Sequence, residues 1–399
     1  MPCTLSRLCR GIAPSLTLAI DARAKEMQAQ GLQVIGFGAG EPDFDTPAAI
    51  RDAAKDALDR GMTRYTPVAG TLELRKAICD KLARDNGLIY TPNQIIACNG
   101  AKHALLNTFL AILDPGDEVL IPSPWWVSYP EMVRMAGGVP VAVPTSDTDG
   151  FVATAAHIAP HITPRTKALI LNSPNNPNGS VWSRQQLAEI ATLAVEKQFY
   201  VVSDEIYEKL IYDGYEHVSI ASLGPDIYAQ TVVINGVSKA YAMTGWRVGY
   251  AAGPAPLITA MTSYQSHATS NINAIAQHAA AVALGSDPAA MRDMVAVFDG
   301  RRKALVSALN GIPGLRCSMP HGAFYAMLDI RGALGKRCKG REITGSMDFA
   351  DALLQEAQVA VVPGIAFDAE GYCRLSYALS MQKIEQGAAR IRTFMANLA

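Results

Sequence analysis

Along the first two thirds of the chain, short apolar runs alternate with longer stretches whose apolar positions have helical spacing. The short runs predict strands at residues 94–98, 118–121, 139–143, 166–171, 199–203 and 232–234. Helices are predicted between them, at 101–113, at 129–135 and from a Ser183 cap to about Lys197. Repeated βα units of this length indicate a mostly parallel sheet with helices on both faces.

The last third of the chain has a different pattern. Residues 287–310 predict one long helix, and strands are predicted at 323–329 and 372–377, with helices between and after them. We expect a smaller α+β domain here, joined by part of the N-terminal region. The expected units are 1–45 (N-terminal arm and part of the small domain), 46–285 (large domain) and 286–399 (small C-terminal domain with its linking helix).

Composition and charge exclude several classes of protein. The 399 residues are 49% apolar and carry a net charge of −1, without a basic stripe, so a nucleic-acid partner is not expected. Apolar runs are too short to span a membrane, and residues 1–11 lack the apolar core of a signal peptide. The seven cysteines (Cys3, Cys9, Cys79, Cys98, Cys317, Cys338 and Cys373) lack metal-binding spacing. These features predict a cytoplasmic protein with no metal site.

Candidate chemistry begins with a lysine and an arginine that follow an apolar strand. Burial near Lys239 would favour the neutral amine, which a carbonyl cofactor requires. Arg247, eight residues later, offers a permanently charged donor fork suited to a phosphate. Taken alone, the pair also fits an ordinary surface lysine at a strand end.

Two loops at predicted strand ends offer further polar groups. Gly100, Ala101 and Lys102 lie where a strand becomes a helix, and the free N–H groups of a helix start favour phosphate. An ordinary turn capped by Asn99 is the structural alternative. Asn176 lies in a proline-stiffened loop after another strand, where its amide could be held against a ligand, although such composition also fits a plain turn.

Three more residues complete the candidate set. Asp204 ends an apolar strand and could cap a helix or hold the proton of a pyridine nitrogen. Trp126 follows another strand and could stack on a flat ring or belong to the core. Arg374 lies in an apolar strand, so it needs a carboxylate partner in the protein or on a substrate. Together these groups meet the requirements of a pyridoxal-phosphate enzyme acting on an amino acid.

With these motifs in place, the chain resembles the class I aminotransferases of pyridoxal-phosphate fold type I. Within them it is most similar to the bacterial aspartate aminotransferase branch that includes prephenate aminotransferases. The resemblance covers about residues 5–395, and its most specific motifs are 38–44 (GAGEPDF), 65–70 (YTPVAG), 173–177 (SPNNP), 203–207 (SDEIY) and 238–247 (SKAYAMTGWR). It implies an α/β fold with a mostly parallel seven-stranded sheet flanked by helices, and a smaller α+β domain formed from both chain ends.

The resemblance also implies roles for individual residues. Lys239 would carry pyridoxal 5'-phosphate covalently and move the reacting proton, and Asp204 would pair with the ring nitrogen. Tyr207 and Asn176 would bind the phenolic oxygen, and Trp126 would stack on the ring. The phosphate would be held by Gly100, Ala101, Lys102, Ser238 and Arg247, and by Tyr65 from the neighbouring subunit of a homodimer. Gly40 and Arg374 would bind the substrate α-carboxylate, with Trp126 and Asn176 beside it, and Lys102 the distal carboxylate.

The implied reaction is ping-pong transamination between L-aspartate and 2-oxoglutarate. The alternatives are an aromatic, prephenate or broad-specificity aminotransferase, a β-lyase on the same fold, or an aminotransferase-like ligand-sensing regulator. Three positions depart from the pattern of the family: Asn178 replaces a common threonine, Gly236 a phosphate-binding serine, and Ala13 a lysine of prephenate-active relatives. The regulator would need a DNA-binding domain ahead of the module, for which the enzyme-like pattern starting at Pro14 leaves little chain.

Overall fold

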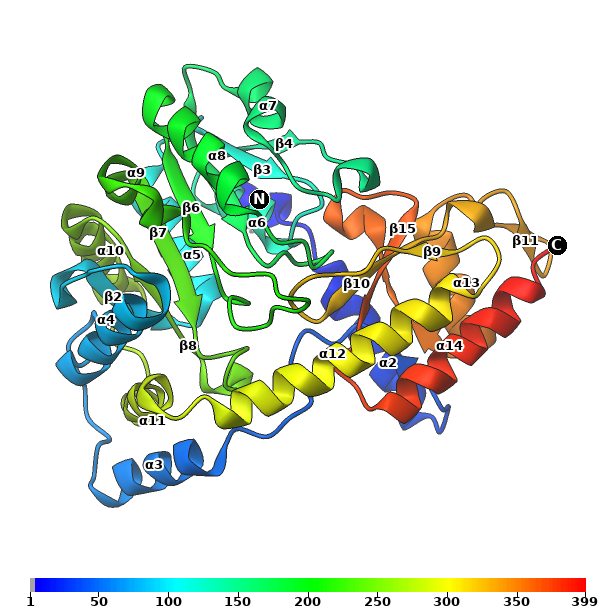
Figure 1. The fold of residues 1–399 in the computed structure, drawn as a ribbon, viewed down its shortest axis with the longest axis horizontal. Coiled ribbons are helices and arrows are strands. Elements are labelled where there is room, and N and C mark those ends of the chain that lie inside the picture. Colours follow the sequence, from blue (N-terminus) through cyan, green and yellow to red (C-terminus); the bar gives the residue numbers. More distant parts are fainter. Residues whose placement is uncertain (1–3) are drawn as a thin grey trace.

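The computed structural model describes residues 4–399, so Cys3 lies outside the described part. A seven-stranded sheet forms the centre of the larger domain, in the order β2-β8-β7-β6-β5-β3-β4 (Figure 1). Its strands are β2 (Ile95–Asn99), β3 (Glu118–Pro122), β4 (Val139–Val143), β5 (Thr166–Asn172), β6 (Tyr200–Asp204), β7 (Thr231–Gly236) and β8 (Val248–Ala252). Only β8 runs antiparallel to its neighbours, β2 and β7. The mostly parallel sheet expected from the sequence is confirmed.

Helices cover both faces of this sheet, which explains why its strands are apolar almost throughout. In β2, Ile96 and Cys98 pack on the face covered by α5 (Ala101–Ile112), α6 (Ser128–Met135) and α10 (Ala255–Ala268). Ile95 and Ala97 face the opposite way, toward α4 (Leu72–Asn86) and α11 (Ala274–Gly285). The helix α8 (Arg184–Lys197) covers that second face over β5 and β6. Successive side chains of each strand are therefore buried on alternate sides.

A smaller four-stranded sheet, in the order β14-β15-β10-β9, lies next to the long helix α12 (Ala289–Asn310) (Figure 1). Its strands are β9 (Arg316–Cys317), β10 (Tyr325–Asp329), β14 (Val362–Pro363) and β15 (Tyr372–Ser376). Beside it, β1 (Ile35–Gly36) pairs in parallel with β13 (Val359–Ala360). This pairing joins the first part of the chain to the last.

The other α-helices of the described residues are α1 (Arg7–Gly11), α2 (Leu16–Ala29), α3 (Ala48–Asp59), α7 (Ala155–Ile158), α9 (Pro225–Gln230), α13 (Ser346–Ala357) and α14 (Met381–Ala396). A two-stranded ribbon of β11 (Arg337–Cys338) and β12 (Arg341–Glu342) completes the set. Among the described residues, none of the helices is both long and apolar enough to cross a membrane.

The element boundaries differ from the expected ones where the backbone changes conformation. The strand expected at 323–329 begins only at Tyr325, because Ala323 has a left-handed φ of 57°. The long helix begins at Ala289 instead of residue 287. At the start of α5, Gly100 is the N-cap and no side chain caps the helix, so the Asn99 cap considered as an alternative is not formed. The first N–H groups of α5 therefore remain available.

Candidate functional site

The predicted polar groups meet at one edge of the large sheet, because the carboxyl ends of its parallel strands lie on the same side. Asp204 ends β6, Asn176 follows β5, and Trp126 follows β3. Lys239 follows β7 at the same edge. Arg247 precedes the antiparallel strand β8, and the reversed direction of that strand places it at this edge as well.

These groups line a cavity of about 600 Å³ between the large sheet and the small domain. The predicted residues that line it are Gly40, Ala101, Lys102, Trp126, Asn176, Asp204, Tyr207, Ser238, Lys239, Arg247 and Arg374. Two predicted residues are not part of its wall: Gly100 lies against the Arg247 guanidinium, and Tyr65 is 90% exposed. Asn178, which replaces the threonine of the family, is buried outside the cavity wall and accepts a hydrogen bond from the Ser180 N–H at 2.7 Å.

Lys239 projects into the cavity with an amine that deprotonates easily. Its Nζ donates a hydrogen bond to the Gly40 carbonyl at 2.6 Å and lies 5.8 Å from the centre of the Tyr207 ring. Burial of the ammonium lowers the pKa of Lys239 to about 8, although Glu41 opposes this shift. Near pH 8 a large fraction of the lysine is thus the neutral amine, which is the form that reacts with a carbonyl.

Asp204 is 3% exposed and also lines the cavity. Its Oδ2 accepts a hydrogen bond from the Tyr129 hydroxyl at 2.7 Å, and its Oδ1 accepts one from the Ile206 N–H at 3.3 Å. Burial raises the pKa of Asp204 to about 6, against the effect of these two donors. The carboxylate caps the local turn through Ile206, yet it forms no salt bridge with any cation of residues 4–399, so a cationic ligand atom would complete its surroundings.

The N-terminus of α5 and Arg247 form a pocket for an anion. Gly100 has φ of 82°, and a Cβ at this position would lie 2.2 Å from Nη2 of Arg247, so only glycine fits. Nη1 of Arg247 donates to the Thr244 carbonyl at 2.9 Å, and Nη2 donates to the Asn99 carbonyl at 3.2 Å. The guanidinium is thereby fixed beside the free helix N–H groups, a combination that suits a phosphate.

Gly236, where the resemblance implies a serine in some relatives, is required by the packing of the sheet. A Cβ at this position would lie 2.8 Å from the Val248 carbonyl and 2.9 Å from Cα of Gly249, both in the neighbouring strand β8. The phosphate pocket therefore lacks a hydroxyl from position 236. The Ser238 side chain, which lines the cavity, offers a replacement.

Arg374 lies in β15 and enters the cavity from the small domain. It is 3% exposed and forms no salt bridge in the described part of the chain; instead, Nη1 donates to Oδ1 of Asn176 and Nη2 to the Gly38 carbonyl, both at 3.0 Å. Its buried Nε has no hydrogen-bond partner. The guanidinium lies 4.4 Å from the Tyr325 ring centre. A buried charge without a counter-ion is costly, so a ligand carboxylate is the expected partner.

Sequence reasoning missed several residues of the cavity wall. Tyr129, which donates to Asp204, lay in a predicted helix without a chemical signal, and Tyr325, whose hydroxyl is 3.0 Å from the Tyr207 hydroxyl, lay in a predicted strand. Thr17 and Leu18 of α2 also line the cavity. Trp126 is partly exposed on the wall, with Nζ of Lys102 4.8 Å from its ring centre, so it is not a core indole.

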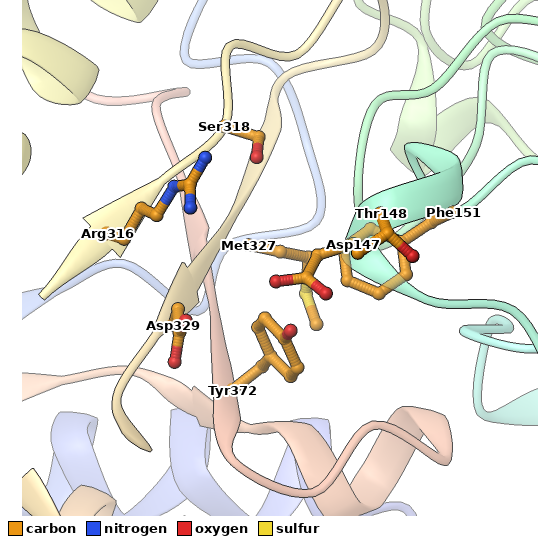
Figure 2. Close-up of a pocket in the computed structure, with 8 residues that line it drawn as sticks. All are labelled: Asp147, Thr148, Phe151, Arg316, Ser318, Met327, Asp329 and Tyr372. Atoms are coloured by element: carbon orange, nitrogen blue, oxygen red, sulfur yellow. The ribbon is translucent and has the colours of Figure 1, made fainter. Parts of the chain in front are cut away.

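A second, smaller hollow of about 90 Å³ lies between residues 147–151 and the small sheet (Figure 2). In Figure 2, Asp147 and Phe151 face Met327, Asp329 and Tyr372 across it. The carboxylates of Asp147 and Asp329 already have a partner, because Arg331 donates a hydrogen bond to Asp147 at 2.7 Å and to Asp329 at 2.6 Å. We therefore interpret this hollow as part of the contact between the two domains.

Comparison with known proteins agrees with this geometry. The chain matches the family "Aminotransferase class I and II" over residues 33–391. It is 49% identical over 394 residues to an aspartate aminotransferase of Bacillus sp. (strain YM-2), covering 98% of this chain and 99% of that protein. It is 47% identical over 397 residues to an aspartate/prephenate aminotransferase of Cereibacter sphaeroides (strain ATCC 17029 / ATH 2.4.9), covering 99% of each.

Two solved structures superpose on this chain over nearly its full length. The aspartate aminotransferase of Rhizobium meliloti superposes with a TM-score of 0.97 at 43% identity, over 100% of both chains. That of Thermus thermophilus with maleate superposes with a TM-score of 0.93 at 45% identity, over 98% of this chain and 100% of that one. The chain belongs to the class I and II aminotransferases, enzymes that use pyridoxal 5'-phosphate to exchange an amino group between amino acids and 2-oxo acids.

Proposed function

We propose that the enzyme transfers the amino group of L-aspartate to 2-oxoglutarate. The observation that carries this proposal is that the cavity wall has two cations, Arg374 and Lys102, besides Lys239, the Arg247 of the phosphate pocket and the salt-bridged Lys25, which suits a substrate with two carboxylates. Relatives that are 49% and 48% identical are named aspartate aminotransferases. The Thermus thermophilus relative was solved with maleate, which is itself a dicarboxylate.

The cavity fits pyridoxal 5'-phosphate at each of its functional groups. The phosphate would lie at the N-terminus of α5, against Gly100, Ala101, Lys102, Ser238 and Arg247. The ring would lie against Trp126, with its nitrogen at Asp204. Tyr207 and Asn176 would donate to the phenolic oxygen: the Oδ1 of Asn176 is occupied by Arg374, which leaves the amide N–H₂ for this contact. When bound, the cofactor supplies an aldehyde for amine condensation and a protonated ring that withdraws electrons from Cα of the amino acid.

Lys239 then acts as the base and acid of the reaction. Its pKa of about 8 makes it available as a neutral amine, and as an ammonium after it has taken the Cα proton. Asp204, negatively charged above its pKa of about 6, would hold the ring nitrogen in its protonated form. Both substrates would use the carboxylate clamp at Arg374, so they cannot bind together. Because the bound cofactor would hold the amino group after the first product leaves, ping-pong kinetics are expected.

Arg374 is expected to determine binding of the α-carboxylate. Arg374→Leu should lower kcat/KM for aspartate by about 10²–10⁴-fold, because two charge-assisted hydrogen bonds are lost. Arg374→Lys should recover only a small part, since an ammonium cannot form the bidentate contact. Steady-state kinetics and a cofactor titration measure this. The cofactor affinity should stay within about twofold, and the exposed Arg51→Lys variant serves as the control; unchanged kcat/KM in Arg374→Leu would exclude the clamp.

Lys102 is expected to select for the second carboxylate. Lys102→Met should lower kcat/KM for aspartate by roughly 10–100-fold, the equivalent of one charge-assisted contact, while alanine and phenylalanine change little. The backbone N–H of residue 102 remains in the variant, so cofactor binding should persist. The experiment compares aspartate, alanine, phenylalanine and cystathionine as donors, and prephenate as an acceptor. Fast turnover of another donor beside negligible turnover of aspartate would refute the aspartate assignment.

Prephenate is the second candidate substrate, since relatives at 47% and 45% identity are named aspartate/prephenate aminotransferases. Ala13 is exposed between α1 and α2 and supplies no cation, and it is not part of the cavity wall. Ala13 therefore offers no contact for prephenate, and the same kinetic comparison measures turnover of prephenate.

The functional unit we propose is a homodimer with shared active sites. Tyr65 is 90% exposed, in the segment between α3 and α4, and does not reach the cavity of its own chain. An exposed tyrosine of this kind is suited to a contact with the phosphate of a second subunit. A monomer in solution with full activity would contradict this arrangement.

A further inference from the structure

His103, in the first turn of α5, accepts a hydrogen bond from outside the helix. Its Nδ1 accepts from the backbone N–H of Asn99 at 3.1 Å. The carbonyl of the same Asn99 accepts from Nη2 of Arg247 at 3.2 Å. The backbone of Asn99 is therefore held on one side by His103 and on the other by Arg247.

The protonation state of His103 suits this contact. The side chain is half-buried, and burial lowers its pKa below the ordinary value of 6.5. At neutral pH the imidazole is uncharged and Nδ1 has a free lone pair, so the ring proton lies on Nε2.

The backbone of Asn99 connects the two parts of the phosphate pocket, the Arg247 guanidinium and the start of α5. Gly100, which follows it, has φ of 82° and lies directly against the Arg247 guanidinium. No side chain caps α5. Behind the helix start, a Cβ at Gly249 would lie 2.2 Å from the Ala101 nitrogen, so β8 packs tightly against the rear of this turn. A rotation of the Asn99 backbone would thus move the acceptor of Arg247 and the first N–H groups of α5 together.

We propose that His103 is a positioning residue for the cofactor phosphate, acting through Asn99 on Arg247 and on the first N–H groups of α5. The inference rests on the proposed binding of pyridoxal 5'-phosphate at this end of the cavity. Gly236 supports this inference. Because the phosphate pocket has no hydroxyl at position 236, phosphate binding depends more on the placement of the remaining donors.

Other helices of the chain show which substitution can preserve the contact. At the start of α7, Nδ1 of His157 accepts from the Thr154 N–H at 3.2 Å. At the start of α8, Oε1 of Gln186 accepts from the Ser183 N–H at 2.9 Å. In both cases the donor lies three residues before the acceptor, whereas the donor of His103 lies four residues before it. Glutamine, like histidine, can thus act as a side-chain acceptor in a first helical turn, whereas leucine cannot.

The test is a titration of the cofactor-free protein with two ligands, pyridoxal 5'-phosphate and pyridoxal, which differ only in the phosphate. His103→Leu should weaken binding of pyridoxal 5'-phosphate roughly 3–10-fold, the equivalent of one hydrogen bond, and leave the affinity for pyridoxal unchanged. His103→Gln should restore the affinity of the wild type. His267→Leu, at an exposed position in α10, is the matched control, and His103→Ala is a second acceptor-free variant with less bulk.

The outcomes separate this inference from the function on which it rests. Equal losses for both ligands, no loss for either, or failure of glutamine to restore affinity would overturn the role of His103 while leaving the proposed function intact. A wild-type protein that binds neither ligand would overturn the proposed function and this inference with it. A loss confined to the phosphorylated ligand, with rescue by glutamine, would establish the role.

Discussion

Lys239→Ala should lose turnover of aspartate with 2-oxoglutarate by at least roughly 10⁴-fold, since it removes both the amine that reacts with the cofactor and the group that moves the Cα proton. No other described amine lines the cavity near the Tyr207 ring; Lys102 lies over Trp126, and Lys25 pairs with Asp21. Lys239→Arg should be nearly as inactive, because a guanidinium does not deprotonate at working pH.

Several controls make this result specific. The measurements are steady-state rates and cofactor content after dialysis, and thermal unfolding verifies that each variant is folded. Lys76→Ala, at an exposed position of α4, should behave like the wild type. Lys239→Ala should still bind the cofactor, more weakly, through the remaining contacts. Near-normal turnover in this variant would refute the role of Lys239 as proton carrier.

Asp204→Asn should lower turnover by about 10³-fold or more and, at the same time, stabilise the cofactor-free protein. The activity falls because a neutral amide cannot hold the ring nitrogen in its protonated form. The stability rises because Asp204 is buried and ionised above its pKa of about 6 without a salt-bridge partner. The amide can keep the contact with Ile206 through its oxygen, and its N–H₂ would donate to the Tyr129 hydroxyl, which donates to Oδ2 in the wild type.

The effect of Asp204→Asn on the free energy of unfolding depends on pH, because the fold raises the pKa of Asp204. The pKa of Asp204 in the fold is higher than its ordinary value of 3.8, so ionisation opposes folding, and the penalty grows as the pH rises from about 4 to above 6. At pH 8, Asp204→Asn should raise the free energy of unfolding of the cofactor-free protein by up to roughly 3 kcal/mol, and the gain should vanish near pH 4. Urea unfolding at both pH values measures this. The exposed Asp293→Asn variant is the control; a variant no more stable than wild type at pH 8 would contradict the interpretation.

Much of the site could be predicted from the sequence because its residues follow strands. A parallel sheet brings the carboxyl ends of its strands together, so Asp204, Asn176, Trp126 and Lys239 could be placed at one edge without knowing the strand order. The apolar strands before them were recognisable because both faces of the sheet are covered. The mostly parallel fold and the family are confirmed.

The rest depended on register and on contacts between domains, which local patterns do not encode. Tyr129 reaches Asp204 across 75 residues of chain, and this contact exists only because β3, β5 and β6 pair in one particular register. The sequence indicated that Arg374 needs a carboxylate partner. It did not indicate that the guanidinium donates hydrogen bonds to Asn176 and to the Gly38 carbonyl. The contribution of α2 to the cavity wall depends on the packing of the N-terminal segment, which periodicity does not reveal.

The position of Arg374 in β15 has a consequence for biosynthesis. The residues proposed to contact the cofactor of the same chain lie between Gly100 and Arg247, whereas the guanidinium proposed to bind the amino acid lies far later in the chain. While a ribosome is still translating the small domain, the emerged polypeptide already contains the lysine and the phosphate pocket but lacks the clamp. The order of translation thus produces the residues proposed to contact the cofactor before the residue proposed to recognise the amino acid.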